Sequence, residues 1–193
     1  NKIFNIRTCL EEVVKSLKYQ AENKEVSLDL NVLDDIPNHI IGDDLRLKQI
    51  LTNLINNSIK FTQKGNITIN VNHKKKTNTT AEFIFKISDT GIGISKKELE
   101  SIFERYTQIS GEKTMNENGI GLGLTIVKNL VELQQGHIQV KSEINKGTTF
   151  IVHIPYKLAT ADATKPSIAE KSFISLNDIN ILLAEDNITN QLI

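Results

Sequence analysis

The stretch from Asp44 to Phe61 constrains the fold more than any other part of the sequence, because it is apolar along one side and rich in carboxamides along the other. On a helix of 3.6 residues per turn, its polar positions fall within roughly 100° of arc. These positions are Asn53, Asn56, Asn57 and Lys60. The opposite side carries Leu47, Ile50, Leu51, Leu54, Ser58 and Phe61. The pattern predicts a helix that is buried along one side only.

The composition is that of a soluble globular protein. Of the 193 residues, 39% are hydrophobic and 24% are charged, which suffices for a core and for its solvation. Lys and Arg together number 23, as do Asp and Glu. We therefore expect no nucleic-acid partner and no membrane-surface partner, and any anionic ligand must be held locally.

The sequence predicts no membrane-spanning segment. No apolar stretch approaches the ~20 residues that cross a bilayer, and no signal peptide opens the chain. We expect no direct membrane insertion by this chain and a cytoplasmic location, although the parent protein can be membrane-anchored. The chain also lacks an initiator methionine, so we expect a piece of a longer protein.

Hydrophobic periodicity predicts further elements on both sides of the asparagine-rich helix. Helices are predicted at 5–23, from Ser95 to about 106, and at 124–131, and strands at 26–32, 67–71, 83–87, 138–144 and 150–154. Asp43 or Asp44 should cap the asparagine-rich helix, and Ser95 with Glu98 should form a capping box. Loops are predicted at 34–42 and 107–118, and an exposed lysine-rich hairpin loop between 71 and 83.

The chain divides into three parts. Residues 1–157 are predicted to form one domain. Residues 158–177 are predicted to be a linker, because they are rich in Ala, Thr, Ser and Lys. Residues 178–193 begin another strand and helix but are too few to bury a core.

Two glycine-rich stretches are candidate ligand contacts. "SDTGIGI", residues 88–94, follows a predicted strand and places Asp89 at its tip, where the carboxylate can accept from an exocyclic amine. "NGIGLGL", residues 118–124, opens a predicted helix, where unpaired N–H groups favour phosphate oxygens. A tight turn or a plain helix start explains either stretch alone. The asparagine-rich helix followed by these two stretches, in this order, indicates a ligand site more specifically than either stretch alone.

Five motifs in order resemble those of the ATP-binding domain of sensor histidine kinases. They are "NLINNSIKFT" for the asparagine box, "DTGIGI" for the first glycine box, "IFERYTQ" for the phenylalanine box, "GIGLGL" for the second glycine box and "GTTF" for the last motif. The superfamily also holds DNA gyrase, the large heat-shock ATPase chaperones and the mismatch-repair ATPases. The resemblance covers residues 1–157. It implies an α+β fold of the Bergerat type, a two-layer sandwich with helices on one face of a mixed sheet, and it implies ATP and Mg²⁺ as ligands.

The resemblance also implies roles for individual residues. Asn57, with Asn53 one turn earlier, would hold Mg²⁺, and Lys60 would contact a phosphate, which makes Asn57 and Lys60 the catalytic pair. Asp89 would accept a hydrogen bond from the adenine amino group. The other implied nucleotide contacts are Gly91, Gly93, Ile94, Phe103, Gly119, Gly121, Leu122, Gly123, Thr148 and Thr149.

The polar stretch 107–118 would be the lid over the nucleotide, with Phe103 as its anchor. Here the chain departs from the family pattern. The second glycine box more often has two glycines followed by Thr or Ser, whereas Asn118 and Ile120 stand in this sequence, so a phosphate-facing hydroxyl is absent. Lys113 is the nearest candidate for the basic residues often found late in the lid.

The residue type at position 53 bears on the reaction. Hydrolases of the superfamily carry a glutamate four residues before the Mg²⁺ asparagine, where it activates water as a general base. An amide cannot take a proton, so Asn53 favours transfer of the γ-phosphoryl group to a histidine. An ATP hydrolase and a nucleotide-binding regulatory module without catalysis stay as alternatives.

The acceptor histidine is expected outside this sequence. None of its four histidines is followed by Glu or Asp on a predicted helix. The family places the acceptor on a dimerisation hairpin, of the same or the partner subunit, which we expect before residue 1. We therefore expect no autophosphorylation by this chain alone. "ILLAEDN" resembles the first strand of a receiver domain, with Glu185 and Asp186 as its acidic pair, so a receiver domain or response regulator is the second expected partner and the parent a hybrid kinase.

The remaining candidates have structural interpretations. Cys9 lies in an apolar run and is expected to be a buried, inert thiol. Asn56 is interpreted as an ordinary exposed polar position, and Lys74 to Lys76 as a solvated hairpin tip. The histidines, which have no metal-ligand spacing, are interpreted as surface or packing residues; they are His39, His73, His137 and His153.

Overall fold

The computed structural model describes residues 2–104 and 122–159. In chain order the elements are β1 (Lys2–Asn5), α1 (Ile6–Asn23), β2 (Val26–Val32), β3 (His39–Gly42), α2 (Asp44–Phe61), β4 (Gly65–Lys75), β5 (Thr80–Asp89), α3 (Lys96–Leu99), α4 (Gly123–Leu133), β6 (His137–Glu143) and β7 (Gly147–Leu158). The predicted linker and receiver segment lie outside the described residues.

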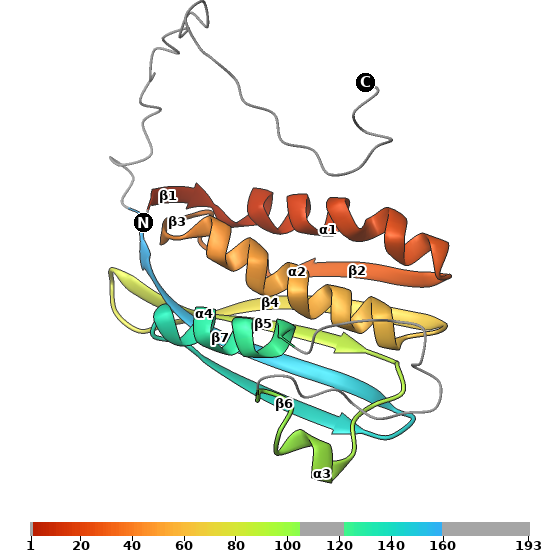
Figure 1. Cartoon of the computed structure of the whole chain (residues 1–193). Helices are drawn as coiled ribbons and strands as arrows, with labels where there is room; N and C mark the ends of the chain where they lie inside the picture. Colours follow the sequence, from red (N-terminus) through yellow and green to blue (C-terminus); the bar gives the residue numbers. More distant parts are fainter. Residues whose placement is uncertain (1, 105–121, 160–193) are drawn as a thin grey trace, which may run out of the picture.

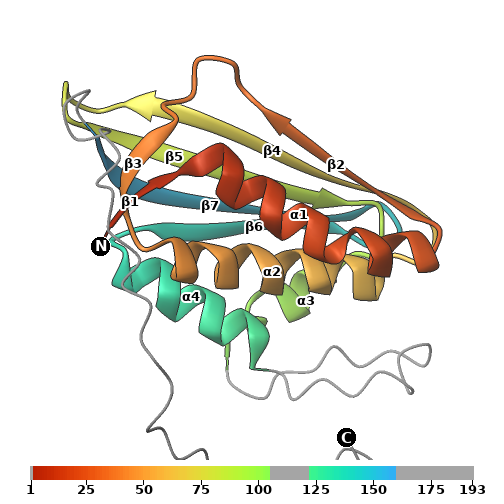
Figure 2. The ribbon, with the colours of Figure 1, turned by 90° about the horizontal axis from the view of Figure 1, so that it is seen from above.

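These strands form one mixed sheet in the order β1-β3-β7-β5-β4-β2, with β6 also paired to β7. β2 and β4 run parallel, and the other neighbouring strands run antiparallel. Helices α1, α2 and α4 lie side by side on one face of the sheet (Figures 1 and 2). The predicted α+β two-layer sandwich is confirmed. No helix in the described part of the chain is long and apolar enough to cross a membrane.

The core lies between this sheet and the three helices. Alternate residues of the central strands face the helices and are buried, among them Ile67, Ile69, Val71, Phe83, Phe85, Ile87, Phe150, Val152 and Ile154. From α2 the buried residues are Leu47, Ile50, Leu51, Leu54, Ile55, Ser58 and Ile59. Each fully buried aliphatic or aromatic side chain contributes about 1.5–3 kcal/mol relative to an exposed one. The core therefore fixes which side of α2 faces away from the sheet.

Asp43 starts α2, as one of the two predicted caps. Its side chain accepts a hydrogen bond from the backbone N–H of Arg46 at 3.0 Å and also pairs with the Arg46 guanidinium at 3.1 Å. Asp44, in the first turn, adds a negative charge where the helix dipole favours one. The position at which α2 begins is thus set by local residues that the sequence identifies.

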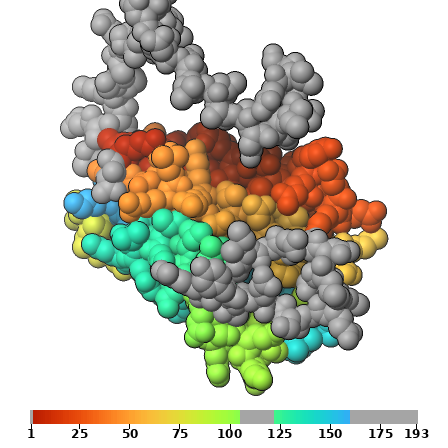
Figure 3. Space-filling model, viewed as in Figure 1, coloured from red at the N-terminus to blue at the C-terminus, as the bar shows by residue number. Residues whose placement is uncertain are grey.

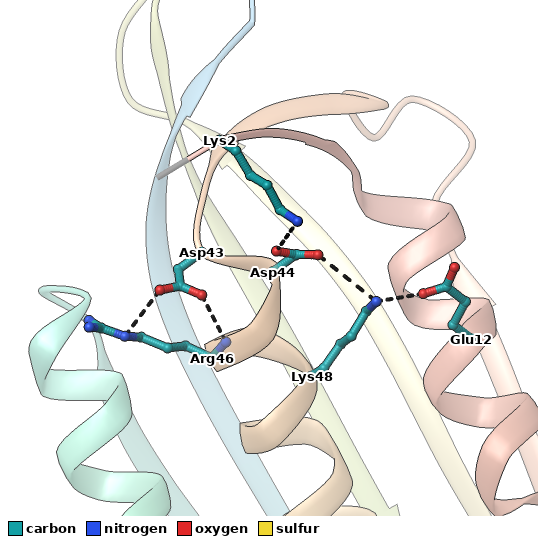
Figure 4. A network of polar contacts seen from close by, with 6 residues as sticks. All are labelled: Lys2, Glu12, Asp43, Asp44, Arg46 and Lys48. Carbon is teal, nitrogen blue, oxygen red and sulfur yellow. Dashed lines mark hydrogen bonds and ion pairs between the residues drawn. The ribbon is translucent and has the colours of Figure 1, made fainter. Parts of the chain in front are cut away.

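Ion pairs join β1 and α1 to the first turns of α2 (Figure 4). The Asp44 carboxylate lies 3.0 Å from Nζ of Lys2 and 3.9 Å from Nζ of Lys48, and Lys48 lies 2.6 Å from the Glu12 carboxylate of α1. Burial alone would raise the pKa of Asp44, but the hydrogen bond from Lys2 and the charges of Lys2 and Lys48 lower it below its usual value. These contacts fix the spacing of α1 and α2.

Some predicted boundaries were wrong. The predicted loop 34–42 contains β3, and residues 2–5 form an unpredicted strand, because each has only four residues and is stabilised by pairing with the other. The predicted hairpin loop is shorter, because β4 and β5 pair through Lys75 and Ala81. The predicted 95–106 helix keeps its capping box, but α3 ends at Leu99 and turns follow.

Two interpretations of single residues have clear outcomes. Cys9 is buried, and burial raises its pKa to about 11, so the thiol is protonated and inert as expected. Asn56 is not the exposed position that we expected: it is half-buried, and its amide oxygen is buried without a hydrogen-bond partner among the described residues. The sequence pattern marked its side of the helix as polar but could not show that neighbouring elements cover it.

Candidate functional site

Asp89 is the centre of the candidate site. It ends β5, faces the helices and is only 9% exposed. Its Oδ1 accepts hydrogen bonds from the backbone N–H of Gly91 at 3.0 Å and of Thr148 at 3.1 Å, and its Oδ2 accepts one from the Ser58 hydroxyl at 3.1 Å. The carboxylate is therefore held by the turn that follows it and by a strand and a helix that are distant in sequence.

Burial decides the protonation behaviour of Asp89. Loss of hydration raises its pKa, and the hydrogen bonds from Gly91, Thr148 and Ser58 counteract this only in part, so the pKa stays above its usual value. All three donors are neutral. The result is a preorganised, ionisable acceptor at the edge of the core.

The first glycine turn packs against the protein's own backbone. A Cβ on Gly91 would collide with the carbonyl oxygen of Phe61, and a Cβ on Gly93 with that of Glu143. Gly93 also has φ +71°, in the left-handed region that favours glycine. The two glycines thus let the turn fit between the end of α2 and the hairpin formed by β6 and β7.

Ser142 of β6 fastens this turn to the β6–β7 hairpin. Its Oγ accepts a hydrogen bond from the backbone N–H of Ile94 at 2.8 Å and donates one to the carbonyl of Gly147 at 2.9 Å. Ser142 Oγ also lies 2.9 Å from the Thr148 hydroxyl. One hydroxyl therefore links the turn that follows Asp89 with the strand that donates to it.

The two predicted threonines lie on different sides of β7. Thr148 is buried and contacts Asp89 through its backbone N–H. Thr149 turns its hydroxyl to that of Ser88, its cross-strand partner on β5, at 3.0 Å. Of this pair, the structure brings only Thr148 together with the Asp89 carboxylate.

The amide side of α2 faces the start of α4. The Nδ2 atom of Asn57 lies 4.0 Å from the position that a Cβ on Gly123 would take. Helix α2 runs between α1 and α4 on this face of the molecule (Figure 3). Asn53, one turn earlier on α2, is half-buried like Asn57. The predicted metal-binding amides thus share a side of the helix, next to the first turn of α4.

The start of α4 has no side-chain cap. Leu122 occupies the N-cap position and makes no capping hydrogen bond. Its side chain has no acceptor for the N–H groups of the first turn, which together with the helix dipole can receive an anion. Gly123 begins the helix, whereas Gly119 and Gly121 lie outside the described residues.

Two further predicted residues lie around this region. The Lys60 ammonium lies 5.3 Å from the centre of the Phe61 ring. Phe103 is partly buried against the core, and its carbonyl accepts a hydrogen bond from the Thr125 hydroxyl at 3.1 Å. The contact between Phe103 and Thr125 joins α4 to the turns that follow α3.

The donor set fits a nucleotide triphosphate with its cation. Among the described residues, no group of three or more His, Cys, Asp or Glu side chains could hold a metal ion by itself. The amides of Asn53 and Asn57 supply neutral oxygens, which suit a hard cation whose charge the phosphates already balance. The uncapped start of α4 suits the phosphates, and Asp89 suits an amino group of a base.

Sequence reasoning missed three residues of this site: Ser58, Ser142 and Gly147. Ser58 was assigned to the apolar side of α2 because its neighbours are apolar. Gly147, with φ +105°, allows the backbone of β7 to pass the Asp89 carbonyl. A serine among leucines and isoleucines is a signal for a buried polar contact, since an unpaired buried hydroxyl is costly.

Comparison with known proteins agrees with this geometry. Residues 42–158 match the family described as histidine kinase-, DNA gyrase B- and HSP90-like ATPases. The signal transduction histidine-protein kinase BarA of Escherichia coli is 41% identical over 151 residues, which are 78% of this chain and 16% of BarA. The autoinducer 2 sensor kinase/phosphatase LuxQ of Vibrio vulnificus is 36% identical over 192 residues, 98% of this chain and 22% of LuxQ. The chain thus spans about a fifth of these relatives.

Solved structures show the same fold. Full-length ShkA, crystallised in complex with AMPPNP, matches 81% of this chain and 31% of its own with a TM-score of 0.68 and 29% identity. The catalytic domain of histidine kinase ThkA matches 80% of this chain and 96% of its own with a TM-score of 0.62 and 24% identity, which supports the fold alone. The chain belongs to the family of histidine kinase-, DNA gyrase B- and HSP90-like ATPases, as the ATP-binding catalytic domain of a histidine kinase.

Proposed function

We propose that the site around Asp89 and the amide side of α2 binds ATP together with Mg²⁺ and prepares its γ-phosphoryl group for transfer. The observation that carries this proposal is the Asp89 carboxylate, buried, preorganised by three neutral donors and placed at a strand end. In the proposal, Asp89 accepts a hydrogen bond from the adenine amino group, and Thr148 borders the base.

The phosphates and the cation occupy the other half of the site. Asn57, with Asn53 on the same side of α2, holds Mg²⁺ through its amide oxygen, and Lys60 places a positive charge at a phosphate. The first turn of α4, with Gly123 and the outlying Gly119 and Gly121, donates backbone N–H groups to the phosphates. Mg²⁺ held by these amides would supply positive charge against the charge that develops on the phosphoryl group during transfer.

The chemistry of Asn53 favours transfer over hydrolysis. Its amide cannot act as the general base that a water attack needs, so the γ-phosphoryl group is retained for another acceptor. We propose that this acceptor is a histidine on a dimerisation hairpin of the parent protein, in the same or the partner subunit. None of the histidines among the described residues lies on a helix, since they belong to β3, β4, β6 and β7.

The parent protein is proposed to be a hybrid sensor kinase. BarA is a signal transduction histidine-protein kinase and LuxQ a sensor kinase/phosphatase, and this chain matches only a segment of each. The resemblance of residues 178–193 to the start of a receiver domain, with Glu185 and Asp186, supports a receiver domain as the next partner. Because ATP is the phosphoryl donor, we place the domain on the cytoplasmic side, whether or not the parent is membrane-anchored.

Calorimetry with a non-hydrolysable ATP analogue tests the binding site. We expect the wild type to bind in the presence of Mg²⁺, and Asn57→Ala or removal of Mg²⁺ to weaken binding by at least about tenfold, since metal ligands carry effects of this size. Asn72→Ala, at an exposed asparagine of β4, is the matched control. If Asn57→Ala binds as tightly as the control, the role assigned to Asn57 is wrong.

A labelling experiment separates the kinase from its alternatives. With γ-labelled ATP, the chain alone should acquire no acid-labile label, and a supplied histidine hairpin of a relative should acquire it. Rapid release of labelled phosphate without the hairpin would indicate a hydrolase. Nucleotide binding with neither label nor release would indicate a regulatory module.

A further inference from the structure

The strongest further observation is the buried hydroxyl of Ser58. Ser58 lies on α2 one residue after Asn57, is 1% exposed and is surrounded on its helix by buried Leu54, Ile55 and Ile59. Its Oγ lies 3.1 Å from Oδ2 of Asp89. A hydroxyl in such apolar surroundings is tolerated because it has this partner.

The acceptor capacity of Asp89 can be counted. An ionised carboxylate offers about four lone-pair sites, two on each oxygen. Oδ1 accepts from the backbone of Gly91 and of Thr148 and is therefore fully used. Oδ2 accepts from Ser58, which leaves one site on Oδ2. The carboxylate thus cannot turn without breaking a bond to the backbone, and its last acceptor site has a fixed direction.

We propose that Ser58 is a positioning residue for base selection. Its hydroxyl orients the remaining acceptor site of Asp89. The site therefore binds a purine with an exocyclic amino group and rejects a purine that has a carbonyl oxygen at the same position. The inference rests on the proposed function, because it assumes that Asp89 meets the base. Ser58 acts through Asp89 and needs no contact with the nucleotide.

The physical basis is the contrast between donor and acceptor. The amino group of adenine donates to Oδ2, whereas the carbonyl of hypoxanthine places a second acceptor against it. Sites built to hydrogen-bond one polar group discriminate strongly against its replacement, because buried groups are then left unpaired. Without the Ser58 hydroxyl, Oδ2 of Asp89 is no longer held in one direction. The affinity for the base with the amino group should therefore fall more than the affinity for the base with the carbonyl.

Protonation gives a second, independent signature. The hydrogen bond from Ser58 is among the contacts that lower the pKa of Asp89 against the effect of burial. Without it, Asp89 takes up a proton at higher pH than in the wild type. A protonated carboxyl donates as well as accepts, so it can bond the carbonyl of hypoxanthine. Loss of discrimination in a Ser58 variant should therefore grow as the solution is acidified.

The chain offers a matched control at the C-terminal cap of the same helix. Thr62, one turn after Ser58, is fully buried, and its hydroxyl has no hydrogen-bond partner among the described residues. Thr62→Val removes a buried hydroxyl without touching Asp89. Any effect shared by Thr62→Val and Ser58→Ala is a general effect on α2, and only the difference between them reports on Asp89.

The test measures the affinities of Mg-ADP and Mg-IDP by calorimetry between pH 5 and 8. IDP carries a carbonyl where ADP carries the amino group. We expect Ser58→Ala to lower ADP affinity about five- to tenfold and to change IDP affinity less than about twofold, as for loss of one ordinary hydrogen bond. Thr62→Val should keep the wild-type ratio. The pH at which ADP affinity falls to half should be higher in Ser58→Ala than in the wild type.

Ser58→Cys provides a second variant of nearly the same size, with a weak donor. It should fold as the wild type, as judged by thermal unfolding, and give an intermediate ADP to IDP ratio. An unchanged ratio in both Ser58 variants, or an equal loss for both nucleotides, would overturn the inference while leaving ATP binding intact. If the wild type binds neither nucleotide, the proposed function itself fails, and the inference fails with it.

Discussion

The hydrogen-bond donors around Asp89 leave only one of its two carboxylate oxygens able to contact a ligand. Both of the backbone donors bind Oδ1, so the two oxygens are not equivalent. Only Oδ2, shared with the Ser58 hydroxyl, has capacity for a ligand. This asymmetry makes the effect of an isosteric substitution predictable.

Asp89→Asn should reverse the base preference. The amide oxygen must take the place of Oδ1, because the N–H groups of Gly91 and Thr148 need an acceptor, so the NH₂ group takes the place of Oδ2. We expect ADP affinity to fall at least about tenfold and IDP to bind more tightly than ADP, since unpaired or opposed polar groups cost about 1–3 kcal/mol. Calorimetry with both nucleotides measures this, and continued preference for ADP would contradict it.

The pH dependence of ADP affinity follows from the raised pKa of Asp89. Base recognition needs the ionised carboxylate, so affinity is present above the pKa of Asp89 and is lost as the pH falls through it. Because burial raises that pKa, we expect the loss to begin above pH of about 4, where an exposed aspartate titrates. Titration of IDP under the same conditions is the control, and it should not show this loss.

At the scale of elements, the spacing of α1 and α2 depends on Lys48. Its ammonium bridges Glu12 of α1 at 2.6 Å and Asp44 of α2 at 3.9 Å. The lowered pKa of Asp44 means that its contribution to stability is present above the pKa of an unfolded aspartate and is lost as the pH falls through the folded value. The contact is therefore expected to matter at neutral pH and to vanish in acid.

Lys48→Met should lower the free energy of unfolding by about 0.5–1 kcal/mol at pH 7, the usual range for partly exposed pairs. The difference from the wild type should be smaller in acid, below the lowered pKa of Asp44, than at pH 7. Urea denaturation at both pH values measures it. Lys64→Met is the control, because Lys64 and Glu25 form a more exposed pair and should contribute nothing measurable. Equal effects of the two substitutions would refute the expectation.

Local patterns predicted those elements whose signals are local. The alternating apolar residues of β5 and the capping residues Asp43 and Ser95 fix their elements without help from distant parts of the chain. β1 and β3 have four residues each and are stabilised by pairing, β1 with β3 and β3 also with β7, so no periodicity reveals them. Short elements that depend on pairing are the ones that sequence reasoning misses.

The residues of the candidate site also fall into two groups, those that a local sequence pattern reveals and those that only folding brings together. Motifs identified Asp89 and Asn57 as residues of interest, because each belongs to a short pattern. They could not identify Ser58 or Ser142, whose partners lie 31 and 48 residues away. These hydroxyls matter only through contacts that folding creates.

At the scale of the whole molecule, the first helix and strands belong to the folding unit. The family match begins at residue 42, yet α1 contributes six buried residues to the common core, namely Ile6, Cys9, Leu10, Val13, Leu17 and Ala21. Losing them removes several contributions of about 1.5–3 kcal/mol each, which together are comparable to the 5–15 kcal/mol that usually separates folded from unfolded domains. Helix α1 is therefore needed for a stable fold.

Two truncations test this view. A fragment of residues 2–159 should unfold cooperatively and bind Mg-ADP as the full chain does, because it keeps every strand of the sheet through β7, which ends at Leu158. A fragment of residues 42–159 should show no cooperative transition, because it lacks α1, β1, β2 and all of β3 except Gly42. Circular dichroism and thermal denaturation distinguish them. Cooperative unfolding of the shorter fragment would show that α1 is an accessory element.

Because the hydrogen-bond donors around Asp89 are neutral, binding of the base there should depend little on ionic strength. Gly91, Thr148 and Ser58 leave the carboxylate with no counterion from its hydrogen-bond partners, and the base that it meets is neutral as well, so added salt has little to screen there. The phosphate end, with Lys60 and the dipole of α4, depends on charge and is weakened by salt. Adenosine and ADP should therefore respond differently to sodium chloride, the nucleoside hardly and the diphosphate strongly, so the two ends of the candidate site can be studied separately by choice of buffer.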